Sequence, residues 1–126
     1  MTTRPAPVLA SFVAVAALLV APLLAPPARA EAPLQRVAAA RVCMVNDNLF
    51  PKDQIPVEVS GKTYFGCCEM CKDRLASDVT LRTATDPVSK KQVDKATAVI
   101  GARSDGRVLY FENAANFERY QSGAGS

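Results

Sequence analysis

Apolar and polar positions alternate over residues 55–59, which is the period of a strand with one buried face. The pair Ser60-Gly61 follows, where glycine permits the positive φ of a tight turn. The aromatic stretch 62–65 then returns as a second strand. Beyond it, Cys71 and Leu75 are spaced to share one helical face, so a short helix is predicted over roughly 68–77. This stretch therefore predicts a β-hairpin followed by a helix.

The same order of elements is predicted a second time, about 45 residues later. An apolar run at 98–102 meets the turn Asp105-Gly106, and the strand 107–111 returns from it. A helix is predicted over roughly 113–121, with Asn113 as its N-cap. A polar loop precedes each hairpin, at 43–47 and at 89–94. We therefore predict an α+β fold of two tandem loop–β-hairpin–short helix units, packed together because neither buries enough alone.

The first thirty residues carry a different pattern. Arg4 precedes an apolar run over 8–25, and the run ends before the small-residue sequence Ala28-Arg29-Ala30. These are the three regions of a secretory signal peptide, so we expect residues 1–30 to be cleaved and the protein to be periplasmic or secreted. The alternative is an uncleaved N-terminal helix that anchors the chain in a membrane. Residues 31–41 are expected to be a flexible tether, and 122–126 a disordered tail.

Charge and composition exclude several classes of function. Removing residues 1–30 removes two arginines and no acidic residue, so the net charge falls from +3 to +1. The remaining charges are mixed in sign, which argues against a nucleic-acid partner. The sequence contains no histidine and no phosphate-binding glycine loop, and no hydrolytic or phosphoryl-transfer apparatus is visible. We therefore expect a binding protein and not an enzyme.

The four cysteines carry the candidate chemistry. Cys67, Cys68 and Cys71 lie together where the first hairpin meets its helix, and Cys43 lies in the preceding loop. Unpaired N–H groups at a helix start favour thiolate over thiol. Three or four thiolates suit one soft metal ion, Zn²⁺ or Cu⁺. Cys68 is either a fourth ligand or faces away, because adjacent residues diverge. Met44 and Met70 are interpreted as core or surface residues.

The spacing Cys43-x23-Cys67-x3-Cys71, after a Tyr-Phe strand, resembles the TRASH domain, a treble-clef-like module of heavy-metal trafficking, resistance and sensing. The second unit, from Asp86-Pro87-Val88 to Leu109-Tyr110-Phe111, resembles the related YHS domain. The resemblance implies a cysteine-bearing unit at 42–80 and a degenerate one at 84–121. It also implies metal binding through Cys43, Cys67 and Cys71. With the signal-like sequence of residues 1–30, we expect a role in metal tolerance, delivery or sensing outside the cytoplasm, with a metal transporter or other membrane protein as partner. The gap between Cys43 and Cys67 is longer than usual, and Cys68 is additional.

In the second unit the positions that match the ligands are expected to hold Ser89, Glu112 and Asn116, so this copy should have lost the metal. A weak oxygen-ligand site formed by Asp86, Glu112 and Asn116 is a minor alternative.

Two other functions stay open for the cysteines. Exported proteins commonly carry disulfides, so Cys43 paired with one of the cluster would staple an interaction domain without metal. Adjacent Cys67 and Cys68 pair poorly, and a Cys67–Cys71 bond across one helical turn would be strained. The sequence Cys68-x-x-Cys71 also allows a thiol redox protein, although that function is usually built on a βαβ unit.

Overall fold

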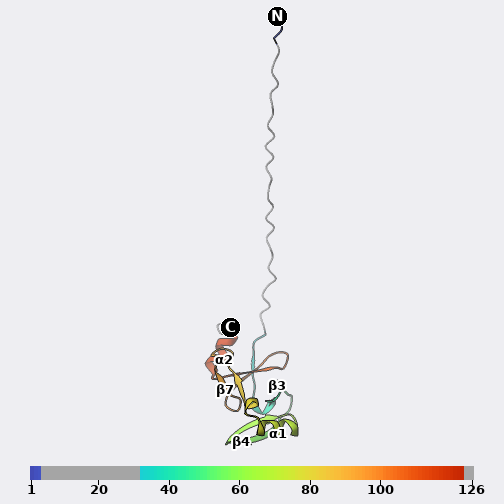
Figure 1. Cartoon of the computed structure of the whole chain (residues 1–126), viewed down its shortest axis with the longest axis vertical. Coiled ribbons are helices and arrows are strands. Elements are labelled where there is room, and N and C mark those ends of the chain that lie inside the picture. The colour runs from blue at the N-terminus through green and yellow to red at the C-terminus, as the bar shows by residue number, and fades with distance from the viewer. Residues whose placement is uncertain (4–31, 124–126) are drawn as a thin grey trace.

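A computed structural model describes residues 1–3 and 32–123 (Figure 1). Nearly all of the predicted signal sequence, and most of the predicted tail, lie outside the described residues. The described chain is a small α+β domain with two α-helices and several small antiparallel sheets, as predicted in outline. Within these described ranges, neither α-helix is long and apolar enough to span a bilayer.

The strands and helices follow one another in short segments. In chain order they are β1 (Gln35–Arg36), η1 (Ala39–Arg41), β2 (Val42–Cys43), β3 (Asn48–Leu49), β4 (Ile55–Val59), β5 (Lys62–Gly66), α1 (Glu69–Ser77), η2 (Val79–Arg82), β6 (Thr83–Thr85), β7 (Gln92–Asp94), β8 (Val99–Ala102), β9 (Val108–Phe111) and α2 (Ala114–Gln121). The two η elements are short 3₁₀ helices.

Both predicted hairpins are present. In β4–β5 the two turn residues Ser60 and Gly61 have φ of 51° and 75°, the left-handed values that a two-residue hairpin turn requires. The β8–β9 hairpin has a longer loop, in which Arg103 N–H bonds to the Arg107 carbonyl at 2.8 Å and Gly106 has φ of 85°. Glycine at both turns removes the steric cost of a side chain at positive φ.

Both predicted helices are also present, each beginning one residue later than expected. Cys68 is the N-cap of α1. Asn113 is the N-cap of α2, and its Oδ1 accepts a hydrogen bond from the Asn116 N–H at 2.9 Å, which confirms that prediction.

The segment expected to be a flexible tether is instead packed. Strand β1 pairs antiparallel with β8, placing Gln35 opposite Ala102. Leu34 is buried with Phe111 and Phe117 in a small apolar cluster. The tether prediction was wrong for this part of the chain because Leu34 packs against β9 and α2, and the two-residue strand pairs with β8, all more than half the chain away.

A further difference concerns the loop expected at 89–94. Its last residues form β7, which pairs with β6 as an antiparallel hairpin. The corresponding segment before β4 is also a small hairpin, made of β2 and β3.

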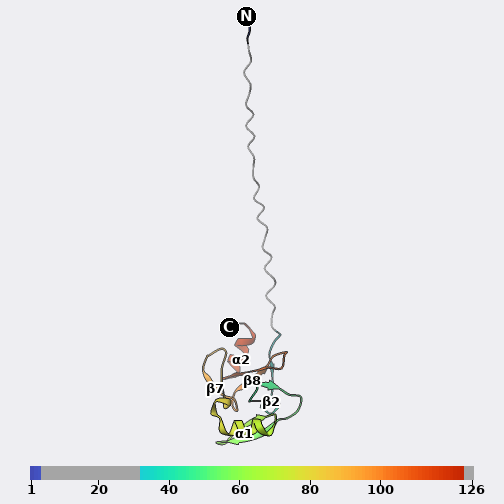
Figure 2. The same ribbon diagram turned by 45° about the vertical axis from the view of Figure 1, so that its right-hand side comes forward.

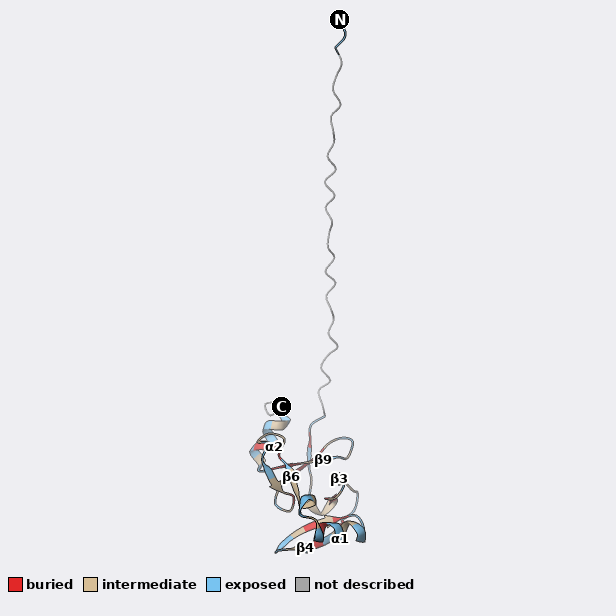
Figure 3. Cartoon of the chain, viewed as in Figure 1, coloured by how far each residue is buried: buried red, intermediate tan, exposed pale blue. Residues whose placement is uncertain are grey.

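The main apolar core is shared by the two halves of the domain. Its members from the first half are Val42, Met44, Val57, Tyr64 and Leu75, and those from the second are Ile100, Ala102, Val108 and Tyr110. Figure 3 colours buried positions red and exposed ones pale blue, and buried positions occur in both halves of the domain. A joint core is expected for units this small, because neither buries enough apolar surface to be stable alone.

The two halves also exchange polar contacts across this core. The Tyr64 hydroxyl donates to Asp94 Oδ1 at 2.9 Å, and the Tyr110 hydroxyl donates to Asp47 Oδ1 at 2.9 Å. Each half therefore supplies a buried tyrosine to an aspartate of the other half. Helices α1 and α2 lie at opposite ends of the domain (Figures 1 and 2), so these contacts mark its middle.

Candidate metal centre

Cys43 is the fully buried member of the group of cysteines. It ends β2 and begins a tight loop, in which the Asp47 N–H bonds back to the Cys43 carbonyl at 2.9 Å and Asp47 has φ of 54°. The next residue, Met44, donates its N–H to the Phe65 carbonyl at 2.8 Å. That bond joins the loop to the end of β5 and so brings Cys43 next to Cys67.

Cys67 lies in the bend between β5 and α1, and Cys71 lies in the first turn of α1. The helix approaches β5 closely at Gly66. A Cβ placed on Gly66 would lie 3.0 Å from the Cys71 Cβ and 3.1 Å from the Lys72 nitrogen. Glycine is therefore needed here so that the Cys71 side chain can lie against the strand that leads to Cys67.

The structure brings Cys43, Cys67 and Cys71 together. Their Sγ atoms all lie within 4.8 Å of one another, and those of Cys67 and Cys71 are 3.6 Å apart. Zinc–thiolate bonds of about 2.3 Å in a tetrahedral arrangement place two sulfurs about 3.8 Å apart. These three cysteines could therefore hold one metal ion. We call this group the three-cysteine cluster.

The four thiols have unequal electrostatic surroundings. Burial alone would raise the pKa of Cys43, but the backbone N–H groups of Asn46 and Val45 outweigh it and lower that pKa. The pKa of Cys67 is raised, chiefly by its hydrogen bond to Cys43 and then by burial. Burial, and then the thiols of Cys68 and Cys67, raise the pKa of Cys71 to about 12.

Of the three cysteines at the helix start, it is not Cys67 or Cys71 whose thiolate the surroundings favour. The residue that benefits is Cys68, whose pKa is lowered chiefly by the nearby backbone N–H of Cys71. Cys43, on a loop outside any α-helix, is the other thiol whose surroundings favour the charged form. A soft metal binds the thiolate form, so a lowered pKa at Cys43 reduces the cost of losing the proton when a metal binds.

Cys68 is placed apart from the three-cysteine cluster although it is adjacent in sequence. It is exposed, it caps α1, and it does not belong to the group of sulfurs that lie within 4.8 Å of one another. Met44 is fully buried in the core, and Met70 is 71% exposed. This agrees with their interpretation as core and surface residues.

The second half has the same loop geometry as the first, but at a different residue from the one expected. The Lys90 N–H bonds to the Asp86 carbonyl at 2.9 Å and Lys90 has φ of 60°, which reproduces the bond from Asp47 to Cys43. Asp86, and not Ser89, therefore occupies the position of Cys43. Counting along the sequence aligned Ser89 with Cys43 because the loop after Asp86 differs in length from the loop after Cys43, and the β8–β9 turn differs in length from the β4–β5 turn.

The Asp86 carboxylate is fully buried and hydrogen-bonded on both oxygens. Oδ1 accepts from the N–H groups of Val88 and Ser89 at 2.7 and 3.1 Å. Oδ2 accepts from the Glu112 N–H at 2.7 Å and from the Asn116 side-chain amide at 2.8 Å. The minor prediction of an oxygen-ligand site is not supported, because these donors already satisfy the carboxylate. Asp86 instead joins the loop, strand end and helix that the cysteines join in the first half.

A buried lysine next to the three-cysteine cluster was not predicted from the sequence. Lys95 is 4% exposed, and its ammonium donates to the Met44 carbonyl at 2.8 Å and to Asp47 Oδ1 at 2.6 Å. It also lies 5.0 Å from the centre of the Tyr110 ring. Burial and the Asp47 carboxylate raise the pKa of Tyr110, so its hydroxyl stays a donor. The sequence gives little indication that Lys95 is buried, because it follows Asp94 in a segment with the composition of a polar turn.

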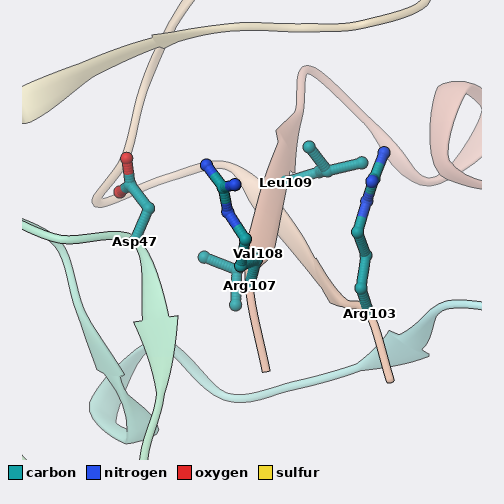
Figure 4. Close-up of a pocket in the computed structure, with 5 residues that line it drawn as sticks. All are labelled: Asp47, Arg103, Arg107, Val108 and Leu109. Carbon is teal, nitrogen blue, oxygen red and sulfur yellow. The ribbon is translucent and has the colours of Figure 1, made fainter. Parts of the chain in front are cut away.

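A second feature near Asp47 is a surface pocket of about 260 Å³ lined by Asp47, Arg103, Arg107, Val108 and Leu109. Figure 4 shows the two arginine side chains extending in the same direction from the β8–β9 hairpin. Arg103 donates to the Tyr120 hydroxyl at 2.9 Å. The pocket contains no thiol and is separate from the three-cysteine cluster.

Comparison of the chain with protein-family models, curated proteins and solved structures finds no match in any of the three.

Proposed function

We propose that the protein binds one soft metal ion, Zn²⁺ or Cu⁺, through Cys43, Cys67 and Cys71. The observation that carries the proposal is the convergence of these three sulfurs, from a loop, a bend and a helix, within 4.8 Å of one another. Thiolates favour soft or borderline ions over Mg²⁺ or Ca²⁺. The absence of histidine from the sequence leaves sulfur as the soft donor.

The biological setting that we propose is metal tolerance, delivery or sensing outside the cytoplasm, without catalysis. The signal-like pattern of residues 1–30 supports export. The partners would be the metal ion and a metal transporter or other membrane protein. The alternative setting is a chain anchored by an uncleaved N-terminal helix.

We further propose that the domain consists of two treble-clef-like copies, TRASH-like at 42–80 and YHS-like at 84–121. Three observations support duplication. Each half runs in the order hairpin, hairpin, helix. The loops after Cys43 and Asp86 share a backbone hydrogen bond and a positive φ. Glu112 and Asn116, the residues that match Cys67 and Cys71, both bond to Asp86.

The redox alternative receives no support from the strand arrangement. Every strand pair among the described residues is antiparallel, whereas a thioredoxin-like site sits on a βαβ unit with parallel strands. The alternative that the experiment must distinguish from metal binding is a domain stapled by disulfides. All four cysteines are free thiols in the structure.

One experiment tests the proposal. The protein is purified under reducing conditions without chelator, its zinc and copper are counted by elemental analysis, and its free thiols are titrated. We expect about one metal ion per chain, lost in Cys71→Ser. Ser89→Ala is the matched control, because Ser89 lies in the corresponding loop of the half without thiols. Metal-free protein with no reactive thiols would instead establish the disulfide-stapled form.

A further inference from the structure

The three-cysteine cluster is more exposed on one side than on the other. Cys43 is fully buried, Cys71 is partly exposed, and Cys67 is exposed. Structural zinc sites are usually closed by four protein ligands, while sites that exchange a ligand keep one position open. Three converging sulfurs leave a fourth tetrahedral position to be filled, and the exposure of Cys67 places the accessible edge of the cluster at the start of α1.

Cys68 stands at this accessible edge. It is exposed and adjacent to Cys67, yet it lies outside the set of mutually close sulfurs. As the N-cap of α1 it has extended backbone, with φ of −156°. Its place is therefore that of a thiol beside the cluster and facing solvent. Cysteine is not among the preferred N-cap residues, so helix capping does not explain the residue type.

The second half of the domain, which has no cysteines, shows which residue occupies the N-cap position that Cys68 holds in the first half. The N-cap of α2 is Asn113, which does make the capping bond to Asn116. Asparagine is among the best N-cap residues. The half that carries the three-cysteine cluster thus has a weaker cap and an additional solvent-facing thiol at the matching position.

Resting on the proposed function, we propose that Cys68 is the exchange ligand through which the metal enters and leaves the three-cysteine cluster, to and from a partner that offers thiolates. In the outward step the bond from the metal to Cys67 breaks as a bond to Cys68 forms. An incoming thiolate of the partner then replaces a protein thiolate. Each thiol that joins the metal releases its proton to water, each that leaves takes one up, and the metal keeps its oxidation state.

The order of these steps follows from burial. Cys67 and Cys68 are the two exposed thiols, so exchange begins with them. Cys43 is enclosed by the core, so it releases the metal last. The partner is therefore a thiol-bearing ligand of the metal, and an aminocarboxylate chelator that offers only oxygen and nitrogen would use the thiol pathway poorly.

The test compares the full chain, loaded with Zn²⁺, with its Cys68→Ser and Cys68→Asn variants. Cys68→Asn is the matched control, because it installs the cap of the second half while removing the thiol. Stopped-flow mixing with a synthetic Cys-x-x-Cys peptide should show transfer slowed about tenfold in both variants. Zinc stoichiometry should stay the same, with affinity changed by less than about threefold.

Two results would overturn the proposal. Transfer rates equal to those of the unchanged chain would show that Cys68 takes no part in exchange. A loss of affinity of about 100-fold in both variants would show that it is a permanent fourth ligand. Transfer to an aminocarboxylate chelator is measured in parallel and should change little. If the unchanged chain binds no zinc, the proposed function fails instead, which this design distinguishes from failure of the exchange step.

Discussion

The Sγ atoms of Cys67 and Cys71 lie 3.6 Å apart, although one residue is in a bend and the other is in a helix. This separation is close to the edge of a zinc–thiolate tetrahedron, about 3.8 Å. It arises because Gly66 lets the first turn of α1 rest against the end of β5. Metal binding at these sulfurs would thus need little rearrangement of the backbone.

Metal removal should destabilise the protein measurably. A ligand that binds the folded state alone adds about 2.7 kcal/mol when its concentration is 100 times its Kd. We expect the midpoint of thermal unfolding to rise with added Zn²⁺ and to return to the metal-free value with excess chelator. In Cys43→Ser the midpoint should no longer respond to zinc. A full response in that variant would contradict the assignment of Cys43 as a ligand.

Gly66→Ala should weaken zinc binding by about tenfold, because the new methyl group would push Cys71 and the start of α1 away from β5. Competition with a chromophoric chelator measures the affinity. Thr63→Ala, on the same strand, is the control and should leave the affinity unchanged. If Gly66→Ala binds zinc normally, the close approach at Gly66 does not determine the geometry of the cluster.

Asp86 should contribute stability that is lost in acid. Burial would raise its pKa, but the N–H of Glu112, the amide of Asn116 and the N–H groups of Val88 and Ser89 outweigh burial and lower the pKa below 3.8. A carboxylate with a lowered folded-state pKa stabilises the fold above its unfolded value. That stability is lost as pH falls through the folded-state pKa.

The corresponding variant is Asp86→Asn, which keeps the shape and removes the charge. We expect the free energy of unfolding to fall by on the order of 3 kcal/mol at neutral pH. The charged acceptor of four hydrogen bonds is lost, and the new side-chain N–H₂ group points at N–H donors of the protein. Urea unfolding between pH 7 and pH 3 measures it, and the difference from the unchanged chain should shrink toward pH 3. A difference that is constant with pH would exclude the charged form of Asp86 as its source.

Lys95→Met should weaken zinc binding and lower stability together, since Lys95 holds the Met44 carbonyl and Asp47 at the two sides of the loop that begins at Cys43. Removing the ammonium leaves the Met44 carbonyl without this donor, at a cost of about 1–2 kcal/mol, while the side chain of Asp47 is 42% exposed and water can solvate its charge. The matched control is Lys62→Met, whose lysine pairs with Asp94 at 2.7 Å on an exposed surface. Zinc affinity is measured by competition, and equal effects in the two variants would argue against a positioning role for Lys95.

The sequence predicts the local elements of this domain well because each has its own signal. Alternation over 55–59 and the glycine of the turn predict the first hairpin, and Asn113 predicts the start of α2. The cysteine spacing likewise predicts that Cys43, Cys67 and Cys71 meet. The hairpin and the helix start depend on neighbouring residues. The meeting of the cysteines depends on one further step, in which the first hairpin brings Cys43 back to Cys67.

Features that depend on distant partners are not visible in the sequence. Nothing near Leu34 in the sequence shows that it will be buried against Phe111 and Phe117. Likewise, nothing near Lys95 shows that its ammonium will bond to the Met44 carbonyl, 51 residues away. The sequence suggests for Asp86 only a weak metal site, because its four donors come from three separate segments. Hydrogen bonds between distant polar residues, such as those to Asp86, leave no periodic pattern in the sequence, whereas the apolar residues of strands and helices do.

The pairing of β1 with β8 has a consequence for folding kinetics. The two strands flank the whole first half, so joining them closes a loop of more than 60 residues, whose entropic cost exceeds that of either local hairpin. The hairpin–helix unit that carries the cysteines consists of local contacts and should form early. We therefore expect a newly made chain to be able to capture its metal before the N-terminal strand is in place, with that strand closing the domain last.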